Sequence, residues 1–481
     1  MKKKILFVVL PYLIKQDKLS LKSILSIPYG VLSIASFIKD HAEVGIFDCN
    51  LFNNFEDVFL ETAGCFYPDI IAISMQFENS YQYLPAIIKV IKAFDKKIEI
   101  VIGGETCNYY AEQILERHPE IDAVCLGEGE LPVFDYITSG VLRKGWITRK
   151  NNCADKYIAD DLSDFIDIDY SLIDIEKYQD SMEESYSPYM FGKEGKKQFM
   201  IVSSRGCIYS CKFCRNSTNQ NKKIRYASVD SIIAHVEKLI LEYGMNVLTF
   251  WDDQLLYDSD RAIELFNRLA VYKLRIEMPS GLSPNYIDSE LLKSMDRAGV
   301  DTLYLAIESG SKEVLKIMNK PVSLDYVKEL MPEIRDYNFF VMVFLVIGMP
   351  GETDKHRQET IEYLKKIKPD LVSVRVASPV PGSKLRQECL EKGYIKDGKL
   401  GDFLMVDAVI NTPEYSAEYI NSLCMLINWE FNFKLSRQME IGNYWNAKHY
   451  FQYVLDKYPD EEVTKFYLEN VIKKIKGQYI L

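Results

Sequence analysis

Apolar runs of strand length alternate with amphipathic stretches of helical period over the first 145 residues of the chain. The predicted strands are residues 4–10, 43–48, 70–74, 99–103 and 123–126. The predicted helices are residues 30–40, 55–63, 81–94, 111–117 and 131–138. This alternation predicts an α/β domain, residues 1–145, with a Rossmann-like five-stranded parallel sheet. Ligands of such sheets lie beyond the carboxyl ends of the strands.

A second series of the same kind begins at residue 198. Its predicted strands are residues 199–203, 247–251, 275–278, 302–307, 341–346 and 371–376. Its predicted helices are residues 229–243, 261–272, 289–298, 324–337 and 354–367. Six successive strand–helix units predict a (β/α)6 partial TIM barrel, residues 198–395, whose functional face is where the strands end.

The remaining chain lacks this rhythm. Residues 146–197 are acidic and Tyr-rich, which predicts a linker, and residues 396–481 are predicted to form a small α-helical region. The offsets of one tetratricopeptide-type hairpin are met by Gly442, Tyr444, Ala447, Phe451, Leu455 and Pro459. A single copy forms no solenoid, so we expect the hairpin to pack on the barrel or on a partner. An ordinary amphipathic helix pair that closes the barrel is the alternative.

Composition narrows the class of protein. With 481 residues, 48% hydrophobic and 26% charged, the chain is long enough for two or three globular domains. A net charge of −11 argues against nucleic acid as the main partner, because binding to phosphates requires a surplus of Lys and Arg. No apolar run reaches the roughly 18 residues of a membrane span, and the short run after the N-terminal lysines fits a first strand better than a secretion signal. We therefore expect a cytoplasmic protein.

Ten cysteines are present, and seven are isolated in the sequence. In a reducing compartment isolated cysteines are mostly small buried side chains. These seven are Cys49, Cys65, Cys107, Cys125, Cys153, Cys389 and Cys424.

The other three, Cys207, Cys211 and Cys214, form a C-x3-C-x2-C motif directly after the first predicted barrel strand. Three thiolates on one loop can hold a [4Fe–4S] cluster and leave its fourth iron open to a small molecule. The alternatives are a zinc site or three buried thiols. Zinc usually takes four protein ligands in two pairs, and the sequence contains no second C-x2-C.

This spacing, with Phe213 before the last cysteine, resembles the radical S-adenosylmethionine (SAM) superfamily. The resemblance implies that the amino and carboxylate groups of SAM bind the open iron. One electron, supplied by a donor such as flavodoxin or ferredoxin, would then break the sulfonium S–C bond and give methionine and a 5′-deoxyadenosyl radical.

Polar residues at other strand ends extend the resemblance. Asp252 and Asp253 end the second barrel strand, where a carboxylate would hold the methionine ammonium group; a helix N-cap is the alternative role. Glu308 or Ser309, after the fourth strand, would bond the ribose hydroxyls.

The last two strands carry two further candidates. Gly348, after the fifth strand, would let the backbone approach adenine. Arg375, in the sixth strand, is a candidate for the carboxylate of SAM, with a structural ion pair as the alternative.

A Rossmann-like domain ahead of this barrel resembles the cobalamin-binding subfamily. The matching positions are residues 28–35, Ser74, Gly103, Gly104, Gly127 and Glu128. The resemblance implies that small residues at these strand ends make room for the nucleotide tail of cobalamin. The cobalt-ligating Asp-x-His-x-x-Gly motif is absent, and the alternative is a domain that supports the barrel without the cofactor.

The resemblance implies a cobalamin-dependent methyltransferase that acts on an unactivated carbon of a peptide, a small natural product or a lipid. A radical enzyme for cyclisation, C–C or C–S bond formation, or rearrangement is the second reading. A non-catalytic iron–sulfur redox or interaction protein is the third.

Overall fold

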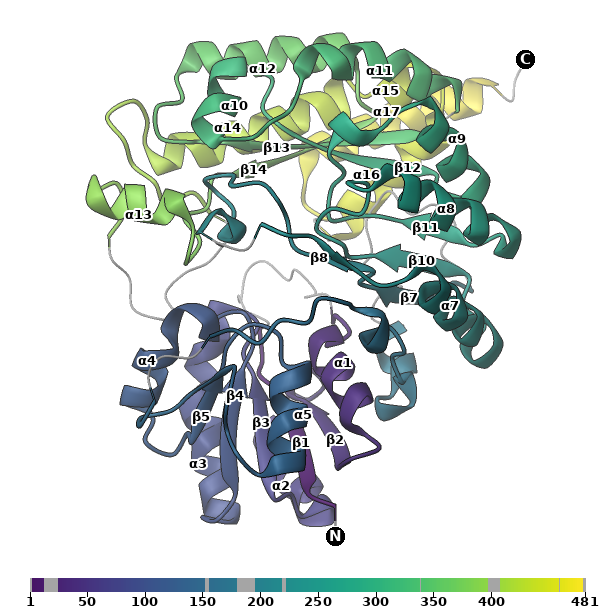
Figure 1. Cartoon of the computed structure of the whole chain (residues 1–481). Helices are drawn as coiled ribbons and strands as arrows, with labels where there is room; N and C mark the ends of the chain where they lie inside the picture. The colour runs from purple at the N-terminus through teal and green to yellow at the C-terminus, as the bar shows by residue number, and fades with distance from the viewer. Residues whose placement is uncertain are drawn as a thin grey trace. The chain divides into compact units, whose positions relative to one another are not determined.

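The computed structural model describes residues 2–12, 25–151, 155–179, 195–218, 222–337, 339–396, 407–457 and 459–478. The chain forms two compact units (Figure 1). Unit 1 contains the described residues of Met1–Ser185 and the segment Tyr226–His235. Unit 2 contains those of Tyr186–Arg225, Val236–Lys396 and Met405–Leu481.

Unit 1 is built on a six-stranded sheet of order β2-β1-β3-β4-β5-β6. Five strands are parallel, as the sequence predicted: β1 (Lys4–Val9), β2 (Glu43–Asp48), β3 (Ile70–Ser74), β4 (Glu99–Gly103) and β5 (Ala123–Cys125). The sixth, β6 (Trp146–Ile147), pairs antiparallel with β5 and lies inside the predicted linker. Two residues are too few to leave an alternating pattern, so this strand was not predicted.

Five helices cover the two faces of this sheet. They are α1 (Tyr29–Ile38), α2 (Phe55–Phe66), α3 (Leu84–Phe94), α4 (Cys107–Arg117) and α5 (Glu130–Ser139). The odd-numbered residues of β1 pack with α1 and α5, and the even-numbered ones pack with α2, α3 and α4. This alternation is the two-residue period of a strand buried on both faces. Parallel strands with helices on both sides confirm the predicted α/β fold.

Unit 2 contains the six parallel strands predicted for the barrel, in chain order. They are β7 (Gln198–Ile201), β10 (Val247–Phe250), β11 (Arg275–Glu277), β12 (Thr302–Glu308), β13 (Phe340–Ile347) and β14 (Leu371–Val376). They form two three-stranded sheets, β11-β10-β7 and β12-β13-β14, which single bridges at Ile276–Val300 and Leu282–Leu305 join. The intervening helices are α7 (Val229–Tyr243), of which only the part from Val236 belongs to unit 2, α8 (Ser259–Leu269), α9 (Ser289–Ala298), α10 (Lys312–Met318), α11 (Leu324–Asp336) and α12 (Asp354–Ile367).

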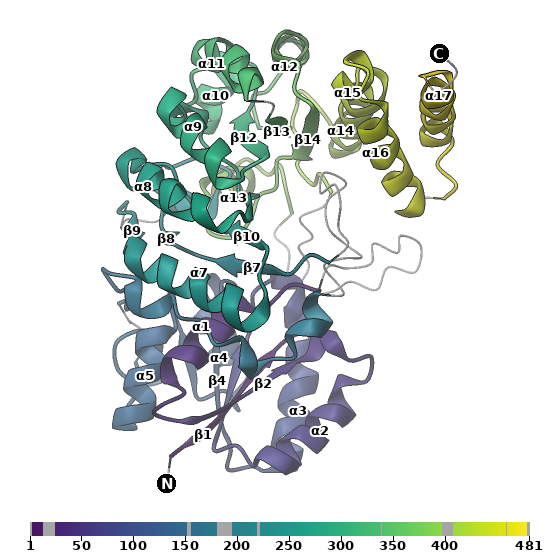
Figure 2. The same cartoon turned by 90° about the vertical axis from the view of Figure 1, so that its right-hand side faces the viewer.

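After α13 (Lys384–Glu391), the C-terminal helices pack on the barrel strands instead of forming a separate domain (Figure 2). They are α14 (Ala417–Trp429), the π-helical turn η8 (Glu430–Lys434), α15 (Arg437–Glu440), α16 (Tyr444–Lys457) and α17 (Glu462–Gln478). The α16–α17 pair encloses an apolar cluster with Phe433, Ala447 and Phe451, and Tyr450 packs against Met342 and Leu371 of the barrel. The hairpin therefore packs on the barrel, as one of the two expectations had it.

Two asparagines of this region cap the edge strand β14. Asn428 and Asn432 each accept a hydrogen bond from a backbone N–H of β14 and donate one back to a C=O, at 2.9–3.0 Å. The residues that they reach are Val374 and Val372. Four helical residues rise about 6 Å and two strand residues span about 6.6 Å, so the two repeats match. The edge of the sheet is thus satisfied by side-chain amides instead of a seventh strand.

The isolated cysteines follow the prediction in most cases. All described cysteines are free thiols; Cys49, Cys107, Cys125 and Cys389 are buried and Cys424 is half-buried, whereas Cys65 is exposed. Cys153 lies outside the described residues. Of the helices that the structure describes, none has the length and apolar character required to cross a bilayer.

Candidate functional site

The three clustered cysteines lie on the loop that follows β7 and the short strand β8 (Ser204–Arg205). Cys211 is buried, whereas Cys207, Cys214 and Phe213 are half-buried. The loop begins at Gly206, whose φ of +103° and lack of a side chain are both required. A Cβ there would lie 2.5 Å from the backbone oxygen of Lys223.

The three thiols interact electrostatically. Burial raises the pKa of each, that of Cys211 to about 11, and the proximity of Cys207 and Cys214 adds to the shift at Cys211. Among the described residues, no three His, Cys, Asp or Glu side chains converge closely enough to hold a single metal ion. Soft thiols that share one loop and one electrostatic environment fit a larger iron–sulfur group held from one side.

Two aspartates at the end of β10 hold the start of this loop. Asp252 is buried and accepts hydrogen bonds from the backbone N–H of Ser203 at 2.8 Å and from the hydroxyls of Ser203 and Ser204 at 2.6 Å. Asp253 accepts from the N–H of Gly206 at 3.1 Å. Burial raises the pKa of Asp252 to about 6 against the lowering effect of the serine bonds.

The alternative role for this pair of aspartates, a helix N-cap, is wrong. Asp258 caps α8, accepting from the N–H of Arg261 at 3.1 Å. Asp252 and Asp253 are therefore anchors of the cysteine loop.

The end of α10 contacts the same loop from another side. The N–H of Lys212 donates to the C=O of Met318 at 2.8 Å, and the side chain of Asn319 donates to the C=O of Ser210 at 3.0 Å. The next residue, Lys320, forms an ion pair with Glu308. The cysteine loop is thus fixed both by the aspartates of β10 and by the segment that follows β12.

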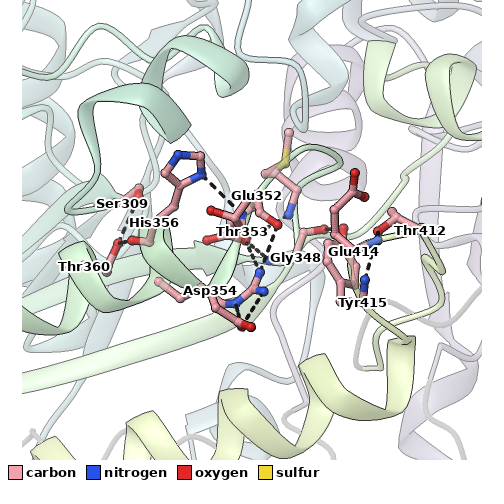
Figure 3. Close-up of polar contacts among 12 residues, drawn as sticks. Ser309, Gly348, Glu352, Thr353, Asp354, His356, Thr360, Thr412, Glu414 and Tyr415 are labelled. Carbon is pink, nitrogen blue, oxygen red and sulfur yellow. Dashed lines mark hydrogen bonds and ion pairs between the residues drawn. The ribbon is translucent and has the colours of Figure 1, made fainter.

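The two predicted ribose-binding positions at the end of β12 already have protein partners. Glu308 has a φ of +68° at a register shift of the strand and is paired with Lys320. Ser309 is buried; its hydroxyl lies 3.2 Å from that of Thr360 and accepts from the N–H of Ser311 at 3.1 Å (Figure 3). These contacts shape the turn after the strand.

Gly348, at the end of β13, is also held by neighbouring groups (Figure 3). Its N–H donates to the carboxylate of Glu352, and its C=O accepts from the hydroxyl of Tyr415. A Cβ at this position would lie 2.8 Å from the side chain of Ile420, and φ is +85°. The side chain of Ile420 in α14 therefore lies where a side chain at position 348 would be.

A buried ion pair completes this loop. Burial raises the pKa of Glu352 to about 7, while hydrogen bonds and the guanidinium of Arg357, 3.7 Å away, oppose the shift. Arg357 bonds Asp354 at 2.8 Å and lies over the rings of Tyr415 and Tyr419 at 5.5 and 5.6 Å. Sequence reasoning missed these residues; a Glu and an Arg five positions apart after a Gly-x-Pro-Gly turn were the available signal.

Arg375 is exposed on β14, opposite Val346 of β13. Within the described ranges its side chain makes no hydrogen bond or ion pair. The structural ion pair considered as its alternative role is therefore not formed there, and the guanidinium is accessible to a ligand.

Unit 1 presents the predicted cobalamin positions at the carboxyl ends of β3, β4 and β5. All five, Ser74, Gly103, Gly104, Gly127 and Glu128, are half-exposed. This accessible edge of small residues lies beside the point where the strand order reverses, between β1 and β3, and it fits a ligand that enters at the sheet edge. Gly104 has a second reason to be small, because a Cβ there would lie 2.6 Å from the backbone of Met75.

Two histidines of unit 1 lie away from this edge. His41 and His118 follow α1 and α4, and helices of a parallel α/β sheet end at the amino edge of the strands. The third histidine of unit 1, His235, lies in α7. The end of β2 instead carries a buried Asp48, which accepts from Asn50 and from the hydroxyl of Tyr178 at 2.9 Å. Tyr178 comes from the predicted linker, 130 residues away, which no local pattern connects to Asp48.

Each of the two units resembles a known protein family. Residues 201–364 match the family model of the radical SAM superfamily, and residues 25–135 match that of the B12 binding domain. The cytidylyl-2-hydroxyethylphosphonate methyltransferase of Streptomyces wedmorensis is 28% identical over 428 residues, which cover 80% of this chain and 79% of that protein. An uncharacterized methyltransferase of Pyrococcus horikoshii is 24% identical over 407 residues, covering 82% of this chain and 85% of that one.

Solved structures show the same fold. The cobalamin-dependent SAM radical enzyme OxsB, with aqua-cobalamin and SAM bound, superposes with a TM-score of 0.70 at 15% identity, covering 100% of this chain and 76% of OxsB. The radical SAM methyltransferase TsrM from Kitasatospora setae superposes with a TM-score of 0.65 at 14% identity, covering 81% of this chain and 76% of TsrM.

Proposed function

We propose that this chain, whose residues 201–364 match the radical SAM superfamily and residues 25–135 the B12 binding domain, is a cobalamin-dependent methyltransferase acting on an unactivated carbon. One observation carries the proposal: three thiols on one loop after the first barrel strand, in a chain that begins with a B12 binding domain. Two relatives that match most of the chain are methyltransferases by name, which favours methyl transfer.

The cofactors of this proposal are a [4Fe–4S] cluster, SAM and cobalamin. When bound, they supply an electron, a carbon-centred radical and a methyl group, respectively. The thiols of Cys207, Cys211 and Cys214 would hold the cluster, and the aspartates at the end of β10 keep their loop in place. The exposed guanidinium of Arg375 would bind the carboxylate of SAM by a charge-assisted hydrogen bond.

The contacts in the structure modify the roles proposed for the other candidate residues. Glu308 and Ser309 would approach the ribose only through groups not used by Lys320 and Thr360. Gly348 would act through the shape of its loop. The half-exposed small residues at the ends of β3 to β5 would receive cobalamin.

Substrate and location belong to the same proposal. The substrate is a small molecule, a peptide or a lipid, and a flavodoxin or ferredoxin would donate the electron in the cytoplasm.

A second candidate function is radical cyclisation or rearrangement. The anaerobic magnesium-protoporphyrin IX monomethyl ester cyclase of Cereibacter sphaeroides is 23% identical over 348 residues, covering 69% of this chain and 54% of that protein. Mass spectrometry of the product separates the two functions, because methylation adds one CH2 and cyclisation removes two hydrogens.

The first test is anaerobic reconstitution of the purified chain with iron and sulfide. We expect a cluster signal after reduction, corrinoid absorbance after incubation with cobalamin, and formation of 5′-deoxyadenosine from SAM. The triple variant C207A/C211A/C214A should bind no cluster, whereas C65A, which removes an exposed thiol, should bind it fully. A triple variant that retains the cluster, or a wild-type chain that takes up no corrinoid, would contradict the proposal.

A further inference from the structure

A buried ion pair lies beside the loop of the three thiols. The Nζ atom of Lys320 is 2.9 Å from Oε1 of Glu308, and the two side chains are only 12% and 10% exposed. Lys320 directly follows Asn319, which ends α10 in the left-handed conformation and bonds Ser210 of the cysteine loop. The backbone next to Lys320 is therefore held against the loop, and the ion pair with Glu308 holds the ammonium group itself.

The charge of Lys320 acts on the whole trio. It lowers the pKa of Cys207, Cys211 and Cys214 alike, against the larger effect of burial. Lys222 also lowers the pKa of Cys207, while Glu308 raises that of Cys211. The pKa of Lys320 itself is raised: Glu308 and the thiols outweigh the lowering effect of its burial, so the group stays charged at neutral pH.

We propose that Lys320 is a positioning residue that places a fixed positive charge beside the iron–sulfur cluster and makes its one-electron reduction easier, with Glu308 as the counter-charge. The inference rests on the proposed function. It goes beyond it by assigning a role to a residue that is not expected to touch iron or SAM.

The physical reason is the change of charge on reduction. The cluster accepts one electron, from dithionite in the experiment below, and no bond is made or broken and no proton is transferred. A group held by three thiolates becomes more negative in this step, and its potential depends on nearby charge and solvent exposure. A buried ammonium group stabilises the reduced form, because the low dielectric of the interior weakens electrostatic interactions less than water does.

Lys212 provides the matched control. It lies between Cys211 and Cys214, yet its side chain is 35% exposed and paired with Glu388 at 3.2 Å. Because water screens its charge, Lys212 should have almost no effect on the reduction potential of the cluster.

The experiment is a redox titration, followed by electron paramagnetic resonance, of the reconstituted full-length protein without SAM. Iron content and thermal unfolding are measured in parallel. We expect K320M to shift the potential to more negative values, with reduction about tenfold less favourable, which is about 59 mV for one electron. K320R should restore the wild-type potential, and K212M should leave it unchanged. E308Q should shift it in the opposite direction.

Several results would overturn the inference. These are a fully loaded K320M with the wild-type potential, a K320R that shifts as far as K320M, or an E308Q that shifts in the same direction as K320M. If K320M binds too little iron because Glu308 is left unpaired, the double variant K320M/E308Q replaces it. The reduction potential of the double variant should then lie between that of wild type and that of the cluster remaining in K320M. A potential outside this range refutes the role of Lys320. A wild-type chain that assembles no cluster refutes the proposed function instead.

Discussion

Tyr415→Phe and Tyr419→Phe form a matched pair that tests how the C-terminal region holds the loop after β13. Both rings lie over Arg357 at almost equal distance, and each variant loses one hydroxyl. Tyr415 is 6% exposed, and its hydroxyl donates to the C=O of Gly348. Tyr419 is 43% exposed, and its hydroxyl donates to the exposed carboxylate of Asp354.

The expected costs differ because water can replace only one of the two bonds. Removing the buried hydroxyl leaves the C=O of Gly348 unsatisfied, at about 1–3 kcal/mol of unfolding free energy. Removing the exposed hydroxyl should cost about 0.5 kcal/mol or less. At about 2–4 °C per kcal/mol, Y415F should unfold several degrees lower than Y419F in calorimetry. Binding of SAM to the reconstituted protein should weaken in Y415F and not in Y419F. Equal effects of the two variants on unfolding temperature and SAM binding would refute this reasoning.

Four further variants test other parts of unit 2. D252A leaves two serine hydroxyls and one N–H unsatisfied, so it should lower the free energy of unfolding by about 3 kcal/mol or more and cause loss of bound iron. D258A removes only a helix cap and should lower the free energy of unfolding by about 1 kcal/mol. Since the folded-state pKa of Glu352 is raised to about 7, its stabilising contribution is complete below about pH 4.5 and is lost as the pH rises through 7; the unfolding temperature of wild type relative to E352Q should fall between pH 5 and 8. N432A leaves two backbone groups of β14 unpaired and should lower the free energy of unfolding by about 2–4 kcal/mol, measured by denaturant titration.

Every strand of the two predicted series is found in the structure, because parallel strands covered by helices are continuous apolar runs bounded by turns. The sequence failed where an element is short or its partner is distant. Strand β6 has two residues, and Tyr178 reaches Asp48 across 130 residues of chain. Segments on either side of the predicted boundary at residue 145 therefore belong to one unit.

The site shows the same division between local and distant information. The cysteine motif was recognisable because all three cysteines lie within eight residues. The roles of Asp252 and Gly348 depend on partners 49 and 67 residues away, which spacing cannot show. A glycine at a strand end indicates that something approaches closely, and in Gly348 the approaching group is Ile420 of the protein itself.

The C-terminal region thus shapes the carboxyl ends of the last barrel strands as well as contributing to stability. Asn428 and Asn432 satisfy the outer edge of β14, the strand that carries Arg375. Tyr415 and Ile420 fix the end of β13, the neighbouring strand. The last two strands of a partial barrel have no closing strand beside them, so their ends depend on whatever covers that edge. Differences in this region among proteins of the same fold should therefore change the loops at the carboxyl ends of β13 and β14 while leaving the cysteine loop, which β10 and α10 hold, unaffected.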